Sequence, residues 1–226
     1  MSKPILIFDM DGVLVDVTES YRETIARTAE HFTGEPVTRE RIQEYKNRGG
    51  FNDDWRLTHQ IVTDAGVDVA FDAVKERFQK IFLGDGAGGL ILRERWVARP
   101  GMLENLAQRF RLAVFTGRPR AEAEITLRRF AGGLVFDPVL AMEEVENHKP
   151  HPEGLLRILK DHSECKPFYI GDTVDDARCA RAAGVPFIGI AAPSNPAYID
   201  LVFLFQAEGA YAIVDDINYL EEVFAS

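Results

Sequence analysis

Two aspartates stand one residue apart near the start of the chain, in the segment Phe8-Asp9-Met10-Asp11-Gly12. They directly follow the apolar run 5–8, which predicts a buried strand that ends in two carboxylates. In an open α/β sheet, ligands bind beyond the carboxyl ends of the strands, so acids at this position are well placed for chemistry. Asp-Gly is also a hairpin signal, and residues 13–15 could be a returning strand, so this segment alone leaves both interpretations open.

Three later segments carry further chemically useful groups. One follows the apolar run 112–115, one lies in a loop before a predicted helix, and one follows the apolar run 167–170. Each has an ordinary explanation when taken singly, as a helix cap, an acid at a helix start or a solvated loop lysine. Four such segments in this order, with three of them at strand ends, favour a shared site. The groups concerned are Thr116, Gly117, Arg118, Lys149, Asp172 and Asp176.

The four segments resemble the four signature motifs of the haloacid dehalogenase superfamily of hydrolases. Within it, the chain is most similar to the helical-cap group that contains phosphoglycolate phosphatase and β-phosphoglucomutase. The resemblance implies that Asp9 is the nucleophile and forms an aspartyl-phosphate intermediate. It also implies that Asp11 acts as general acid on the leaving-group oxygen and then as general base on the attacking water.

A phosphate monoester already carries negative charge, so an attacking carboxylate needs a cation and hydrogen-bond donors around the phosphate oxygens. The resemblance implies that the Thr116 hydroxyl and the backbone N–H groups near Gly12 and Gly117 hold those oxygens. Lys149 then adds a point charge, a role for which a lysine suffices.

Magnesium is the cofactor that the resemblance implies. Mg²⁺ prefers oxygen ligands and usually takes one or two protein carboxylates together with a phosphate oxygen. Asp9 and Asp172 fit those places, and the backbone carbonyl of Asp11 is a further ligand in the family. We expect Asp176 not to bind the metal directly but to orient a metal-bound water or Lys149.

Four further residues are candidates for binding the substrate. Arg118 could contact the phosphate or the substrate, or could be a surface arginine at a helix start. In the segment 46–55, helical-cap relatives use a loop to recognise the leaving group, so we expect Arg48, Asn52 and Trp55 to face the active site. The alternative for this segment is a turn between two helices, with glycines as helix breakers and Asn52 as the next helix cap.

The chain reads as an α/β protein with a doubly wound, Rossmann-like parallel sheet and an inserted all-helical cap. Short apolar runs at 5–8, 112–115, 167–170, 186–191 and 211–214 suit strands covered on both faces. Apolar residues at helical spacing fill the region between the first two runs. We therefore expect a core of residues 1–16 and 97–226 and a cap of residues 17–96. The run 84–89 satisfies G-x-G-x-x-G, but no strand precedes it, so we interpret it as a loop.

Composition limits the partners. The 226 residues carry a formal net charge of −10, which argues against nucleic acid and anionic membranes as partners. The chain has two cysteines and no visible targeting segment, so we expect a cytoplasmic protein that acts on a small phosphorylated metabolite. The sequence determines neither the oligomeric state nor the identity of the metabolite.

The expected function is that of a Mg²⁺-dependent phosphatase acting on a small phosphomonoester. A phosphomutase of the β-phosphoglucomutase kind is the alternative, although that group has a histidine and a threonine where this chain has Val17 and Tyr21. A dehalogenase is less favoured because those relatives lack the second aspartate, which is present here as Asp11. A non-catalytic binding protein on the same fold is a further alternative, since a fold does not fix a function.

Overall fold

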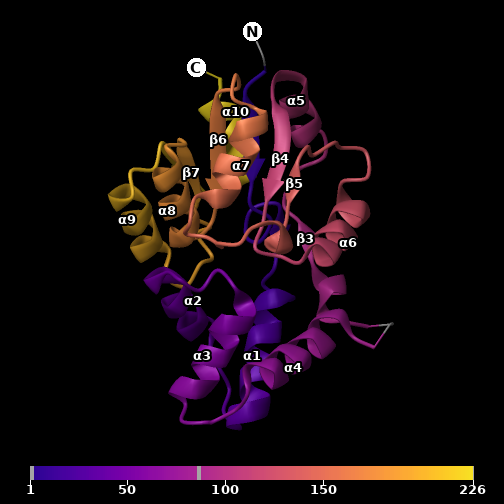
Figure 1. Ribbon diagram of the computed structural model, residues 1–226, viewed down its shortest axis with the longest axis vertical. Helices are drawn as coiled ribbons and strands as arrows, with labels where there is room; N and C mark the ends of the chain where they lie inside the picture. Colours follow the sequence, from indigo (N-terminus) through magenta and orange to yellow (C-terminus); the bar gives the residue numbers. More distant parts are fainter. Residues whose placement is uncertain (1–2, 86–87, 226) are drawn as a thin grey trace.

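The structure is a computed structural model that describes residues 3–85 and 88–225. Its centre is a six-stranded sheet in the order β5-β4-β1-β6-β7-β8, in which every neighbouring pair is parallel (Figure 1). The chain moves outward from β1 through β4 to β5, and then returns to the other side of β1 to form the second half of the sheet. The strands are β1 (Ile5–Phe8), β4 (Arg111–Phe115), β5 (Val139–Leu140), β6 (Pro167–Gly171), β7 (Phe187–Ile190) and β8 (Ala212–Val214).

Helices cover both faces of this sheet because its strands carry apolar residues on both sides. Leu6 and Phe8 of β1 pack in one cluster with α5 and α10, whereas Ile5 and Ile7 pack in a second cluster with α7, α8 and α9. This alternation is the two-residue repeat of a strand. The elements outside the sheet are α5 (Met102–Arg109), α6 (Arg120–Phe130), η2 (Met142–Glu144), α7 (Glu153–Asp161), α8 (Val174–Ala183), α9 (Tyr198–Ala207), η3 (Ile217–Tyr219) and α10 (Leu220–Val223).

A helical layer lies below the carboxyl ends of the strands in Figure 1. It consists of α1 (Tyr21–Thr33), α2 (Arg39–Arg48), α3 (Asp54–Asp64) and α4 (Phe71–Leu83), followed by η1 (Leu90–Arg93). The chain enters this layer through β2 (Val15–Asp16) and leaves it through β3 (Arg95–Trp96), and these two short strands pair antiparallel. The two chain crossings are therefore side by side.

The fold class is the one that the sequence predicts, and each of the five expected strands is present within two residues of its predicted ends. Three short strands were not predicted: β2, β3 and β5 have two residues each, too few for a periodic pattern. The glycine run 84–89 follows the helix α4 and not a strand, which agrees with its interpretation as a loop, although residues 86–87 lie outside the described residues.

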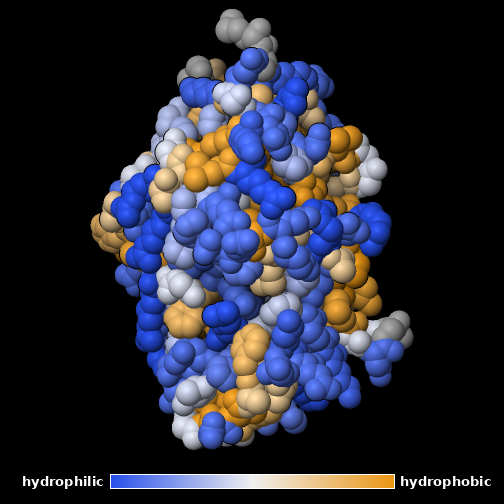
Figure 2. Space-filling model, in the orientation of Figure 1, coloured by the Kyte–Doolittle hydropathy of each residue, from blue (hydrophilic) through white to orange (hydrophobic). Residues whose placement is uncertain are grey.

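The surface is mostly hydrophilic on the face that Figure 2 shows, with hydrophobic atoms along the edge formed by α9. In α9, Leu201 and Phe205 pack into the core, whereas Ile199 and Phe203 are exposed. Only part of the apolar run 201–205 therefore packs into the core. Within the described ranges, no helix combines the length and the apolar character needed to cross a bilayer.

Candidate active site

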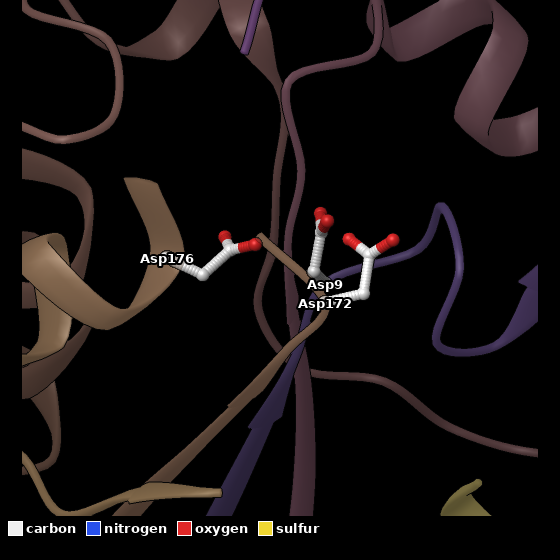
Figure 3. A group of neighbouring side chains, drawn as sticks. All are labelled: Asp9, Asp172 and Asp176. Carbon is white, nitrogen blue, oxygen red and sulfur yellow. The ribbon is translucent and has the colours of Figure 1, made fainter. Parts of the chain in front are cut away.

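Three acidic side chains gather where β1 and β6 end. Asp9 directly follows β1 and Asp172 directly follows β6, and the two strands are hydrogen-bonded neighbours. Asp176 lies one turn into α8 and points toward the other two acids (Figure 3). Carboxylate oxygens of the three residues all lie within 4.8 Å of one another. The order β4-β1-β6 places this cluster at the position where the chain reverses direction across the sheet, which is where open α/β sheets bind ligands.

Asp9 is buried and has a lysine against it. The Nζ of Lys149 lies 2.9 Å from Asp9 Oδ1 and 2.8 Å from Asp176 Oδ1. Burial raises the pKa of Asp9 to about 7, and Lys149 opposes this rise. Burial alone would lower the pKa of Lys149, but the two carboxylates hold its proton and raise the pKa above its usual range. A single ammonium group thus forms ion pairs with two carboxylates.

Asp176 has its hydrogen-bonding capacity filled by protein groups. Its Oδ1 accepts from Lys149 and from the Tyr169 hydroxyl, at 2.6 Å. Its Oδ2 accepts from the backbone N–H and the hydroxyl of Thr173, which caps α8 in return. Although burial opposes it, the charge of Lys149 holds the pKa of Asp176 below its usual range. These four bonds leave Asp176 as a poor direct ligand for a metal, which supports a role in holding Lys149.

Asp172, in contrast to Asp176, has little compensation for its charge from protein groups. Among the described residues, its one ion-pair partner is Arg22, whose Nη2 lies 4.0 Å from Oδ2. Burial raises the pKa of Asp172 well above its usual value. A largely buried carboxylate with so little compensation is a fitting ligand for a cation, and its oxygen donors suit Mg²⁺. Asp9 and Asp172 are therefore the residues that fit a metal, and their carboxylates lie side by side in Figure 3.

Asp11 is held by Arg118. The Nε of Arg118 donates to Asp11 Oδ1 at 2.7 Å, and its Nη2 forms a second bond to the same oxygen. Arg118 is 2% exposed, so it is not the surface arginine that one interpretation of the sequence expects. It lines the pocket, but its donors are directed at protein carboxylates and not at an open phosphate position.

The groups expected to bind phosphate are only partly free to do so. The N–H of Gly12 donates to the carbonyl of Val15 at 2.9 Å, so it is already bonded. The Thr116 hydroxyl is buried and accepts the Arg118 N–H at 3.2 Å. Gly117 lines the pocket. Gly12 has another use: its φ is 72°, and a Cβ there would lie 1.9 Å from Asp172 Oδ2, so only glycine lets the chain pass this close.

The cap segment contributes two of its three predicted residues to the pocket. Asn52 and Trp55 line it together with Asp9, Asp11 and other residues. Arg48 does not, contrary to the expectation from the sequence, because it ends α2 and its guanidinium lies 4.7 Å from the centre of the Tyr45 ring. It lines a separate groove against α9. Asn52 is not the cap of α3, since Asp53 fills that place.

Three residues that were not predicted from the sequence line the pocket, and a fourth, Asp175, connects the helical layer to α8 beside it. Lys46 and Arg22 bring two cations from the helical layer to the pocket, and Tyr21 also lines the pocket. The carboxylate of Asp175 is buried and accepts the N–H of Gly50, with both oxygens at 2.9 Å. No spacing rule signals Tyr21, Arg22 or Lys46, because each belongs to an ordinary amphipathic helix and reaches the pocket only through the packing of the helical layer on the core.

The contact between Asp175 and Gly50 depends on the neighbouring Gly49. Its φ is 82° and its ψ is 166°, a backbone region that only glycine occupies readily. A Cβ at Gly49 would lie 2.2 Å from Nη1 of Arg178 and 2.9 Å from Oδ1 of Asp175. At Gly50, whose φ is 81°, a Cβ would meet nothing within 4 Å.

We expect Gly49→Ala to raise KM because it displaces the core groups against which the helical layer rests. Gly50→Ala is the matched control: it carries the cost of a positive φ, about 1–2 kcal/mol, but no clash. Steady-state kinetics and thermal unfolding of the two variants check this. Equal KM values for both variants would show that this contact does not affect substrate binding.

Comparison with known proteins agrees with the geometry. The family described as haloacid dehalogenase-like hydrolases matches residues 6–190. A phosphorylated carbohydrates phosphatase of Thermotoga maritima is 30% identical over 231 residues, which cover 96% of this chain and 98% of the relative. A solved structure of a putative haloacid dehalogenase-like hydrolase from Bacteroides fragilis superposes with a TM-score of 0.75 at 22% identity, covering 97% of this chain and all of that one.

A further relative is longer than this chain. A Phytophthora nicotianae protein named imidazoleglycerol-phosphate dehydratase is 36% identical over 206 residues, which are 86% of this chain but 45% of the relative. The chain thus spans less than half the length of that protein. The family match covers the strands β1, β4, β6 and β7 and all four motif segments, and the chain belongs to the haloacid dehalogenase-like hydrolases.

Proposed function

We propose that the protein is a Mg²⁺-dependent phosphatase that hydrolyses a small phosphomonoester metabolite through an aspartyl-phosphate on Asp9. The observation that carries the proposal is the placement of Asp9, which is buried, lies 2.9 Å from the ammonium of Lys149, and stands beside the nearly uncompensated carboxylate of Asp172. This arrangement places a nucleophile, a fixed positive charge and a cation ligand together at the carboxyl ends of neighbouring strands. The Thermotoga maritima relative named a phosphatase supports the same reaction class.

The reaction proceeds in two displacements at phosphorus. An Asp9 oxygen attacks phosphorus, the bond to the leaving-group oxygen breaks, and Asp11 gives that oxygen a proton. Water then attacks the phosphorus of the aspartyl-phosphate, Asp11 takes a proton from the water, and the bond to Asp9 breaks. Lys149 stays charged throughout and offsets the negative charge that builds up at the phosphoryl oxygens.

Asp9 and Asp172 would hold the Mg²⁺ ion, together with the backbone carbonyl of Asp11 that the family resemblance adds. When bound, the ion supplies positive charge between the two carboxylates and the incoming phosphate, which otherwise repel each other. The chain's net charge of −10 makes such local attraction necessary for an anionic substrate.

We assign residues 1–16 and 97–226 to a catalytic core and residues 17–96 to a movable cap, with the paired strands β2 and β3 as the hinge. In this structure the cap is closed: the pocket leaves about 30 Å³ for a water-sized molecule, which is room for about one or two waters. A phosphomonoester therefore enters only after the cap swings away from the strand ends, and closure then excludes bulk water.

Phosphate release from a panel of phosphomonoesters, with Mg²⁺ and with a chelator, tests the proposal. The panel should contain sugar phosphates, phosphoglycolate, nucleoside monophosphates and amino-alcohol phosphates. We expect release that requires the metal and that ranks the esters clearly. No release from any ester would contradict the proposal, and a mutase assay with a bisphosphate activator would then be the next measurement.

The dehydratase name of the Phytophthora nicotianae relative is not carried over to this chain. The similarity covers 45% of that protein, and the groups at this site are those of phosphoryl transfer. An imidazole-bearing phosphomonoester nevertheless belongs in the ester panel because of this relative.

We expect the cap to recognise the leaving group. Among the cap residues, we expect substitution of Lys46 to change KM the most. Its ammonium is buried in the pocket and paired with Asp54. We expect Lys46→Met to raise KM for the preferred ester by about tenfold, the value of one charged hydrogen bond, and to alter the ranking of the esters. Arg48→Met is the matched control, because Arg48 lies near the same end of α2 but outside the pocket. An equal effect of both substitutions would assign it to the stability of α2 and not to recognition.

A further inference from the structure

Arg118 is a buried arginine with all three guanidinium nitrogens engaged by protein groups. Its Nε and Nη2 bind Asp11, and its Nη1 lies 2.8 Å from Glu94 Oε1 and 2.8 Å from the Thr126 hydroxyl. The guanidinium carbon also lies 4.7 Å from the centre of the Tyr21 ring. These contacts leave little capacity for binding a substrate phosphate, the role that one interpretation of the sequence expects.

The groups that hold Arg118 come from both crossings between core and cap. Tyr21 begins α1, and Glu94 lies between η1 and β3 on the returning chain. Thr126, on α6 of the core, donates to Glu94 at 2.7 Å and so closes the ring of contacts. Asp11 is 107 residues away from Arg118 in the sequence. The orientation of the guanidinium is therefore fixed by four separate segments.

Stability alone does not explain this arrangement. Burying charged groups costs desolvation free energy, and a buried ion pair is often no more stable than apolar residues of the same size. The cluster does produce a defined orientation, because a guanidinium presents a rigid planar fork. Both contacts to Asp11 use the same oxygen, Oδ1, and the Asp11 side chain remains 26% exposed in the pocket.

We propose that Arg118, held by Glu94 and Thr126, is a positioning residue that fixes one oxygen of Asp11 so that the other oxygen, Oδ2, exchanges the proton with the leaving group. The proposal rests on the proposed phosphatase function. In the first displacement the bond from Asp9 to phosphorus forms, the bond from phosphorus to the leaving oxygen breaks, and the proton on Asp11 Oδ2 moves to that oxygen. In the second, the same oxygen takes the proton of the attacking water.

Leaving groups of different basicity separate this role from a structural one. An alkoxide needs a proton to depart, whereas p-nitrophenolate departs without one. We therefore expect the double variant Arg118→Met/Glu94→Gln to lower the first-turnover release of alcohol from an alkyl phosphate by about 10²-fold, the lower range for general acid catalysis. Release of p-nitrophenol from p-nitrophenyl phosphate should change little. The double variant removes both buried charges together, so neither is left unpaired.

Three controls complete the experiment. Arg128→Met changes an exposed arginine of α6 and should leave both esters at the wild-type rate. Asp11→Asn should show the same dependence on the leaving group, and adding the Arg118→Met/Glu94→Gln pair to it should cost nothing further. Arg118→Lys should recover only part of the loss, because a lysine lacks the fork.

The outcomes are distinct. An equal loss with both esters, or no loss with either, would overturn the positioning role while leaving the phosphatase function intact. Failure of the wild-type protein to release either leaving group would overturn the proposed function itself, and the positioning role with it.

Discussion

Replacing Asp9 with asparagine is expected to abolish phosphate release from every ester, with a loss of at least about 10³-fold in kcat. An amide is a poor nucleophile and cannot form the aspartyl-phosphate. The protein should remain folded, because Lys149 keeps its contact with Asp176 at 2.8 Å and is not left as an unpaired buried charge. Burial raises the pKa of Asp9 to about 7, so ionisation of this carboxyl lowers the stability of the folded protein, and its removal takes away no stabilising charge.

Steady-state phosphate release and thermal unfolding measure the two parts of this result. Acid quenching during turnover should trap a phosphoryl group on the wild-type peptide that contains Asp9 and none on the variant. Asp161→Asn is the control for loss of one carboxylate, since Asp161 is exposed at the end of α7, and it should retain the wild-type kcat. Hydrolysis that survives in Asp9→Asn would assign the nucleophile to another residue.

Asp172→Asn is expected to have opposite effects on activity and on stability. Metal-dependent turnover should be lost because one of the two proposed carboxylate ligands is removed. In the absence of Mg²⁺ the variant should melt at a higher temperature than the wild type at pH 7, because it removes a largely buried carboxylate whose one ion pair within the described residues is the 4.0 Å contact with Arg22. Each kcal/mol gained corresponds to a rise of about 2–4 °C for a chain of this size.

The pH dependence of this stability difference follows from the direction of the pKa shift. Burial raises the pKa of Asp172 in the folded state, so ionisation destabilises the folded protein at pH values above the pKa of the unfolded chain. The difference between variant and wild type should therefore grow as the pH rises above the pKa of the unfolded chain. It should disappear as the pH falls below about 4, where the carboxyl becomes protonated in the unfolded chain as well as in the folded protein.

Mg²⁺ at a concentration one hundred times Kd should raise the free energy of unfolding of the wild type by about 2.7 kcal/mol, and so raise its melting temperature. Asp172→Asn should lose most of this rise. Asp176→Asn is a matched control four residues away: it should lower the melting temperature, because Asp176 accepts four hydrogen bonds and pairs with Lys149. A fall in melting temperature for Asp172→Asn without metal would show that its carboxylate stabilises the fold.

Much of the fold and of the reacting groups is readable from local patterns. Short apolar runs bounded by polar residues locate β1, β4, β6, β7 and β8, because a strand buried on both faces needs uninterrupted apolar residues. The helical spacing of Tyr21, Ile25 and Phe32 locates α1 for the same kind of reason. Since parallel strands end at one edge of the sheet, Asp9 and Asp172 were expected to meet there, and they do.

The cap contacts were not readable in this way. Arg48 and Lys46 lie two residues apart on α2, so they point to different sides of a helix with 3.6 residues per turn. Which of them faces the active site depends on how α2 rests against α8 and α9, a packing decision made by residues far away in the sequence. The sequence favoured Arg48, and the structure places Lys46 in the pocket.

The sequence by itself determined the candidate reacting groups and the layers that present them, because the type of each residue and the period of its neighbours are local properties. Only the tertiary structure decided how those groups are paired. Arg118 required a buried partner or solvent, but nothing local indicated that the partner is Asp11, nor that Glu94 and Thr126 complete its surroundings. An electrostatic pairing depends on distance in space, and here that distance is set by the pairing of β1 with β4 and by the packing of the helical layer against the sheet.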